Sequence, residues 1–237
     1  MRAELRQFFR SPLYWLMLLV GLGARAALAH LDFLHRPEEA WALSGEFWSR
    51  VGSVTMCLLI LVVLIRCFSL DFETGAVSVI ASTPHGRRDV YFSRLAAGCF
   101  AAVSGVIVLA AGNIGIAAYF GGAVPGGWMR GFLLRTVPAA VGAAGYFLVS
   151  AFACDIFANQ PAAVCICGIP FAVSYFINTG MIEAFDAFWF LRYGFFTELL
   201  RGRWIASRPV FWAAWYSLIT TGIFILSICR RKERKLL

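Results

Sequence analysis

The chain has 237 residues, of which 60% are hydrophobic and 14% are charged, and its mean hydropathy is +0.75. A water-soluble domain of this size needs far more polar surface, so the composition excludes that class and indicates an integral membrane protein. The formal net charge of +8 comes without a nucleic-acid-binding pattern, and it suits contact with an anionic membrane surface instead.

The first residues, 1–11, predict a helix that lies in the membrane interface. Arg2, Arg6 and Arg10 are four residues apart on one helical face, and apolar residues lie on another. The alternative is a basic flank that only sets the topology. No small-residue cleavage pattern follows, so we expect the first span to remain in the protein.

Six apolar segments approach the length of about 20 residues that a membrane-spanning helix requires. Their expected ranges are residues 12–30, 49–68, 94–119, 131–154, 161–180 and 209–229. Most of them lack a period of two, which favours helices over a barrel. The sequence therefore predicts an all-α membrane protein with a single transmembrane domain over residues 1–237.

Both termini are expected on the cytoplasmic side of the cell membrane. The basic run from Arg230 to Lys235 follows the last span directly, and positive residues at span ends favour the cytoplasm. An even number of spans places the basic N-terminus on the same side. This arrangement predicts a multi-pass protein of the cytoplasmic membrane.

Three residues near the first outer loop carry specific expectations. Arg25 lies roughly 18 Å along the first span from Leu13, so we expect its side chain to snorkel to the outer headgroups. A substrate-contacting arginine is the alternative. Trp41 and Trp48 are expected to anchor the protein at the interface.

Residues 183–208 are too charged to span a membrane and too apolar for a solvated loop. The segment is crowded with phenylalanine, tryptophan and tyrosine, interrupted by acidic and basic residues. An amphipathic or re-entrant segment at the outer interface fits this pattern, and an ordinary aromatic interfacial helix fits equally well.

A polar segment separates the second and third predicted spans. It runs as an acidic residue, a glycine, apolar positions three apart, a proline break and paired arginines. An acidic residue is favourable near a helix start, glycine allows close approach of a partner, and proline ends the helix before it. The residues concerned are Glu73, Thr74, Gly75, Val77, Ile80, Pro84, Arg87 and Arg88.

This segment, the interfacial first helix, the spans and the aromatic segment before the last span resemble permeases of ABC-2 type transporters. In that family the first cytoplasmic loop is a coupling helix that takes force from a separate ATPase. The resemblance implies this role for the segment, with Glu73 pairing with Arg6. It also implies an all-α fold with a cytoplasmic coupling helix between spans 2 and 3.

The same resemblance implies a function. The chain would be the permease subunit of an ABC exporter that moves a hydrophobic or amphipathic substrate, such as a peptide antibiotic, a drug or a lipid-like molecule. Its partners would be ABC ATPase subunits and a second permease, identical or related. Its small size is similar to that of permeases for bacteriocin immunity and multidrug efflux.

Motifs for chemistry are missing from the sequence. No Gly-x-x-x-x-Gly-Lys-Ser/Thr motif occurs, so ATP and Mg would be bound by the partner ATPase and no cofactor is expected in this chain. The three histidines fall on different sides, and the seven cysteines lie in or beside apolar runs, which favours buried thiols over disulfides or a metal site. We therefore expect a transport subunit and not an enzyme.

Two other classes stay open. A non-transporting membrane scaffold or sensor would use the polar segment to dock a cytoplasmic regulator. A secondary transporter would need acidic residues within its spans, and these are scarce in this sequence.

Overall fold

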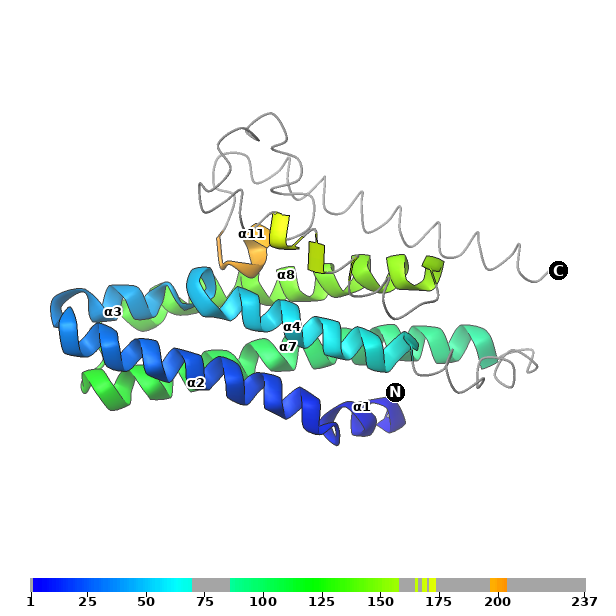
Figure 1. The fold of residues 1–237 in the computed structure, drawn as a ribbon, viewed down its shortest axis with the longest axis horizontal. Helices are drawn as coiled ribbons and strands as arrows, with labels where there is room; N and C mark the ends of the chain where they lie inside the picture. The colour runs from blue at the N-terminus through cyan, green and yellow to red at the C-terminus, as the bar shows by residue number, and fades with distance from the viewer. Residues whose placement is uncertain are drawn as a thin grey trace, which may run out of the picture.

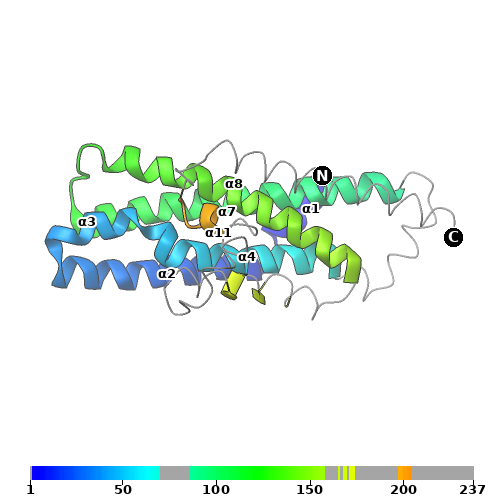
Figure 2. The ribbon, with the colours of Figure 1, turned by 90° about the horizontal axis from the view of Figure 1, so that it is seen from above.

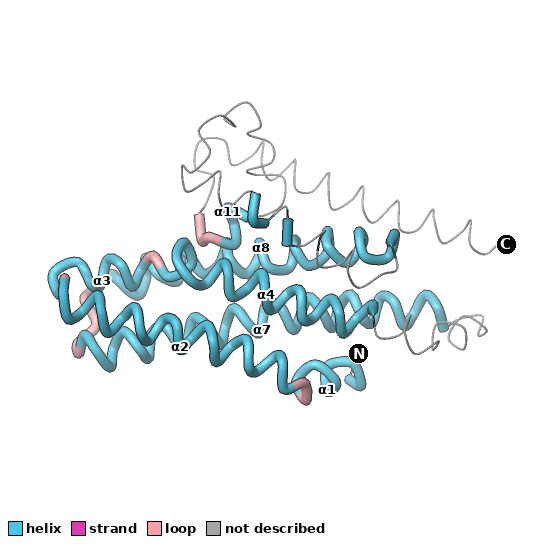
Figure 3. The backbone as a smooth tube through the Cα atoms, viewed as in Figure 1, coloured by secondary structure: helices cyan, strands magenta, loops and turns pink. Residues whose placement is uncertain are grey.

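The computed structural model describes residues 2–69, 86–157 and 197–203, together with residues 165, 168, 169 and 171–173. Every regular element in this part of the chain is helical, and no strand occurs in it. The long helices lie side by side in an elongated bundle (Figure 1). Figure 3 shows how little of the described chain is loop.

The elements follow one another along the chain with short connections. They are α1 (Arg2–Phe9), α2 (Pro12–His35), α3 (Pro37–Gly45), η1 (Trp48–Gly52), α4 (Ser53–Leu64), η2 (Ile65–Ser69), α7 (Gly86–Gly121), α8 (Trp128–Phe157) and α11 (Thr197–Leu200). The segments η1 and η2 are π-helical and bracket α4. A π-helix is rare and usually appears as one turn within an α-helix.

Four stretches are long and apolar enough to cross a bilayer: Pro12–His35, Trp48–Cys67, Phe92–Gly121 and Trp128–Ala151. They mark the chain as a helical membrane protein, and they coincide with the first four predicted spans. The predicted spans at residues 161–180 and 209–229 lie mainly or wholly outside the described residues.

Prolines set the boundaries of the first helices. Pro12 and Pro37 occupy the first turns of α2 and α3, where the missing N–H of proline costs nothing. Arg36 leaves the helical conformation, with φ −139° and ψ 60°, because a residue before proline avoids the α region. The helix α2 therefore continues to His35, five residues beyond the predicted end of the span.

The bundle has two distinct ends (Figures 1 and 2). At one of them, called here the α3 end, α2 meets α3 and α7 turns into α8 through Gly122 and Gly127, both at positive φ. At the other, the α1 end, α1 packs on α2 and α7. With 36 residues, α7 is about 54 Å long and exceeds a hydrocarbon core of about 30 Å.

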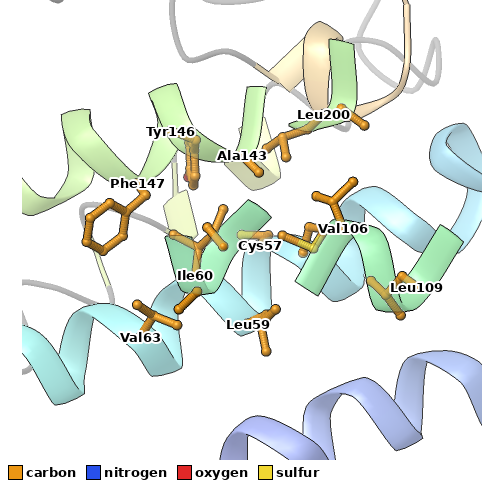
Figure 4. Close-up of a cluster of buried hydrophobic side chains, with 14 of the residues drawn as sticks. Cys57, Leu59, Ile60, Val63, Val106, Leu109, Ala143, Tyr146, Phe147 and Leu200 are labelled. Carbon is orange, nitrogen blue, oxygen red and sulfur yellow. The ribbon is translucent and has the colours of Figure 1, made fainter. Parts of the chain in front are cut away.

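The core lies where α4, α7 and α8 meet (Figure 4). Leu59, Ile60 and Val63 of α4 are fully buried there. From α7 the core receives Val106 and Leu109, and Leu200 of α11 enters it from the far end of the sequence. Residues remote in the sequence thus share one apolar interior.

Candidate functional site

A charged residue is buried in the interior of the bundle. The side chain of Arg25 on α2 is 3% exposed, and its Nε donates a 2.6 Å hydrogen bond to Oδ1 of Asn113 on α7. The Nδ2 of Asn113 donates in turn to the carbonyl of Ser44 on α3, at 3.3 Å. These bonds tie α2, α7 and α3 together inside the bundle.

Asp32 and Arg50 complete this group. Oδ2 of Asp32 lies 2.9 Å from Nη1 of Arg50 on η1 and 3.7 Å from Nη1 of Arg25. Arg50 is the most accessible member, with 36% of its side chain exposed, and Asp32 is 11% exposed. We call Arg25, Asp32, Arg50 and Asn113 the Arg25 cluster.

The Arg25 cluster carries two guanidinium groups and one carboxylate, so one positive charge has no opposing charge within it. Nη2 of Arg25 is buried and has no hydrogen-bond partner among the described residues. A buried charge is expensive when its partners satisfy it incompletely. Ionisable groups at membrane depth commonly mark functional sites, which makes this cluster a candidate.

The expectation that Arg25 snorkels to the outer headgroups is wrong. Its side chain is buried, because Asn113 accepts a hydrogen bond from it and Asp32 opposes its charge inside the bundle. The helix also continues for ten residues beyond Arg25 to His35, about 15 Å. Asp32 follows Arg25 by seven residues and so shares its helical face, which is the signal in the sequence that could have indicated the pair.

Trp48 also differs from its expected place at the interface. It is 0% exposed, and its Nε1 donates to Oγ1 of Thr136 on α8 at 3.0 Å. Trp41 on α3 packs edge-on against Trp128, whose Nε1 donates to the carbonyl of Trp41 at 2.8 Å. Trp48 therefore fastens η1 to α8, and Trp41 fastens α3 to α8.

Residues 197–203 pack against the middle of α8. A Cβ added to Gly142 would lie 2.6 Å from the backbone nitrogen of Leu200, so α8 and α11 touch there through glycine. Gly142 is 14 residues from Trp128, about 21 Å along α8 from the α3 end. Residues 197–203 of the predicted segment 183–208 thus lie against α8 (Figure 1), and the other residues of the segment are outside the described ones.

Charged side chains accompany this segment into the interior. Glu198 and Arg201 are each 7% exposed at the side chain and form an ion pair at 3.5 Å. Arg203, which is half exposed, lies 4.0 Å from the other oxygen of Glu198. The Oγ of Ser49 on η1 donates to the carbonyl of Arg201 at 3.1 Å. The segment is therefore held by polar contacts as well as by Leu199 and Leu200.

At the α1 end, the first helix is amphipathic in the way its sequence predicts. Phe8 is buried in the core, and Arg6 and Arg10 are exposed. The Nε1 of Trp15 on α2 donates to the carbonyl of Phe9 at 2.8 Å, which satisfies a carbonyl at the end of α1. The backbone of Arg2 lies on the same helix, and its side chain is outside the described residues.

The two elements that flank residues 70–85 in the sequence, η2 and α7, are fastened to each other. Nη1 of Arg94 on α7 donates to the carbonyl of Cys67 on η2 at 3.3 Å, and the Sγ of Cys67 approaches the carbonyl of Arg94 at 3.9 Å. The second and third membrane helices are thereby joined at the α1 end.

Most of the predicted coupling residues lie outside the described part of the chain. These are Glu73, Thr74, Gly75, Val77, Ile80 and Pro84. Helix α7 begins at Gly86, two residues after the predicted helix break at Pro84. Arg87 and Arg88 lie on its first turn, and their side chains are not described. The assignment of these residues, including the pair of Glu73 with Arg6, stays a prediction.

The described residues contain no group of three or more His, Cys, Asp or Glu side chains that could hold a metal ion. Cys57 and Cys67 are buried, whereas Cys165 is exposed, so the expectation of buried thiols is wrong for Cys165. The polar contacts of the described residues hold the helices together and keep charged side chains inside the bundle.

No family model, no curated protein and no solved structure matches this chain. The likeness to ABC-2 permeases therefore rests on the residues named above.

Proposed function

We propose that the chain is the permease subunit of an ABC-2 type exporter, driven by a separate ATPase. The observation that carries the proposal is the composition of the α1 end. There the exposed Arg6 of α1 and Arg10, which follows it, lie at the same end of the bundle as the end of η2 and the start of α7, the two elements that flank the polar segment 70–85 in the sequence (Figure 1).

The attachment of this segment supports a mechanical role. The Arg94–Cys67 contacts join η2 and α7, the two elements that flank the segment, so a force on the segment would be passed to both together. These elements continue into α4 and the apolar part of α7, which form the core. Packed helices transmit a displacement because protein interiors are dense and resist compression.

The substrate that fits this proposal is hydrophobic or amphipathic, and the ATPase subunits bind ATP and Mg. A second permease, identical or related, completes the assembly. We infer from the basic residues of the sequence that both termini and the segment 70–85 face the cytoplasm, where ATP is available. The Arg25 cluster then lies in the half of the bundle toward the opposite side.

The test uses the full chain purified in mild detergent with its co-purifying ATPase. We expect ATP hydrolysis that depends on this chain, and Glu73→Ala lowers it about tenfold, equivalent to about 1.4 kcal/mol of coupling, while the amount of inserted protein stays unchanged. The matched control is Asp71→Ala, an acidic residue two positions away in the same segment.

Two outcomes would contradict the proposal. A co-purifying partner that does not hydrolyse ATP would favour a scaffold or sensor. Equal hydrolysis by the Glu73→Ala and wild-type complexes would remove Glu73 from the coupling role.

A further inference from the structure

Three consecutive residues of η1 contact three different elements. Trp48 donates from Nε1 to Thr136 on α8 at 3.0 Å, and Ser49 donates from Oγ to the carbonyl of Arg201 at 3.1 Å. Arg50 donates to Asp32 on α2 at 2.9 Å. One turn therefore holds α8, the segment 197–203 and α2 at once.

The π-helical form of this turn matters for these contacts. The N–H of Ser53 donates to the carbonyl of Trp48, five residues back, which is the bond that defines a π-helix. Return of this turn to α-helical bonding would rotate the preceding residues by about 100° relative to α4, since one residue occupies 100° of an α-helix. All three contacts would be lost together.

We propose that η1 couples the ion pair at Asp32 to the seating of residues 197–203, so that loosening either contact loosens the other. Ser49 and Arg50 are neighbours in one turn, and the fully buried Trp48 fixes that turn against α8. Neither Asp32 nor residues 197–203 can move far unless η1 changes its hydrogen bonding. This coupling depends only on contacts within the bundle and does not rest on the proposed function as an ABC permease.

Coupling between two sites requires an element with two discrete arrangements that both sites bias. In this proposal η1 is that element: the structure holds its π-helical form, and the α-helical form is the second arrangement that the proposal requires. Nη2 of Arg25, beside Asp32, has no hydrogen-bond partner among the described residues, so the buried cluster stabilises the π-helical form of η1 incompletely. This lowers the free-energy difference between the π-helical and the α-helical form.

The experiment measures amide hydrogen exchange by mass spectrometry on the full chain in lipid nanodiscs. Asp32→Asn removes the charge that Arg50 and Arg25 face, at nearly constant size. We expect exchange of the amides of Gly202 and Arg203 to rise about tenfold, a typical strength of coupling, although the Asp32 carboxylate contacts Arg25 and Arg50 and not the described residues 197–203. These amides donate to Leu199 and Glu198 in the wild type.

The control is Glu39→Gln, which removes an exposed carboxylate paired with Arg36 at the same end of the bundle. It should leave exchange at residues 197–203 unchanged. An equal rise in this control, or no rise in Asp32→Asn, would overturn the proposal.

A second variant tests the coupling in the opposite direction. Ser49→Ala removes only the hydrogen bond to the carbonyl of Arg201. Because coupling is reciprocal, exchange of the Arg36 amide, which donates to the carbonyl of Asp32, should rise as well. If Asp32→Asn does not fold, this measurement decides alone, and an unchanged Arg36 amide refutes the coupling.

Discussion

The guanidinium group of Arg25 depends on a small number of partners. Asn113 accepts from Nε at 2.6 Å, Asp32 lies at 3.7 Å, and Nη2 has no partner among the described residues. Arg50 competes for the same carboxylate oxygen at 2.9 Å. The loss of Asn113 should therefore leave a buried charge with little compensation.

We expect Asn113→Leu to lower the free energy of unfolding by about 2 kcal/mol, the range for a hydrogen bond to a charged group. Unfolding of the purified protein in mixed micelles, followed by tryptophan fluorescence, measures this change. Glu39→Gln should stay within about 0.5 kcal/mol, as for other surface substitutions. A loss in Asn113→Leu no larger than in this control would show that the bond stabilises nothing.

The double variant Arg25→Met/Asn113→Leu separates charge from shape. Replacing a buried charged group by an apolar one of similar size is often neutral or stabilising. The double variant should therefore be more stable than Asn113→Leu alone. If it is less stable, the packing of Arg25 matters more than its charge.

At the scale of elements, glycines determine how closely the helices of the bundle approach. A Cβ at Gly98 of α7 would overlap the ring of Phe147 on α8, and one at Gly105 would overlap Leu59 on α4. Gly115, on the same helix, has nothing within 4 Å of its added Cβ. The two kinds of position provide a matched comparison.

We expect Gly98→Ala to destabilise the protein by about 1–3 kcal/mol, the usual effect of overpacking a core. Gly115→Ala should be neutral or slightly stabilising, because alanine has up to about 1 kcal/mol better helix propensity than glycine. The same micelle unfolding measurement compares them. The combination Gly98→Ala/Phe147→Leu should recover part of the loss, and the close contact is refuted if the two alanine variants behave alike.

Considered as a whole, the molecule exposes a broad apolar surface. Leu19 and Leu34 lie on the same helix α2 and are 66% and 64% exposed. They differ in depth: Leu19 is about 10 Å from the start of α2, whereas Leu34 is next to its last residue. In a bilayer, only the first of these positions faces hydrocarbon well away from an interface.

We expect Leu19→Arg to reduce membrane insertion sharply, because an arginine near the middle of a membrane helix costs about 2.5–3.5 kcal/mol. Leu34→Arg should insert normally, since its side chain can reach the headgroups. The fraction of protein that resists alkaline extraction from membranes measures insertion. Equal extraction of the two variants would show that α2 does not cross the bilayer.

Much of this architecture can be predicted locally. The four described spans follow from hydropathy summed over about 20 residues, a property that needs no knowledge of neighbours. The starts of α2 and α3 follow from Pro12 and Pro37, whose rings fix the backbone. The amphipathic α1 follows from the spacing of its arginines and apolar residues.

The partners of the buried charges required the tertiary structure. Arg25 and Asn113 are 88 residues apart, and Ser49 and Arg201 are 152 residues apart, so no local pattern indicates that they meet. Which faces of apolar helices contact each other depends on side-chain packing over the whole bundle. Local composition thus determined that these helices belong in a membrane, and packing alone decided that Arg25 stays inside and that residues 197–203 lie against Gly142.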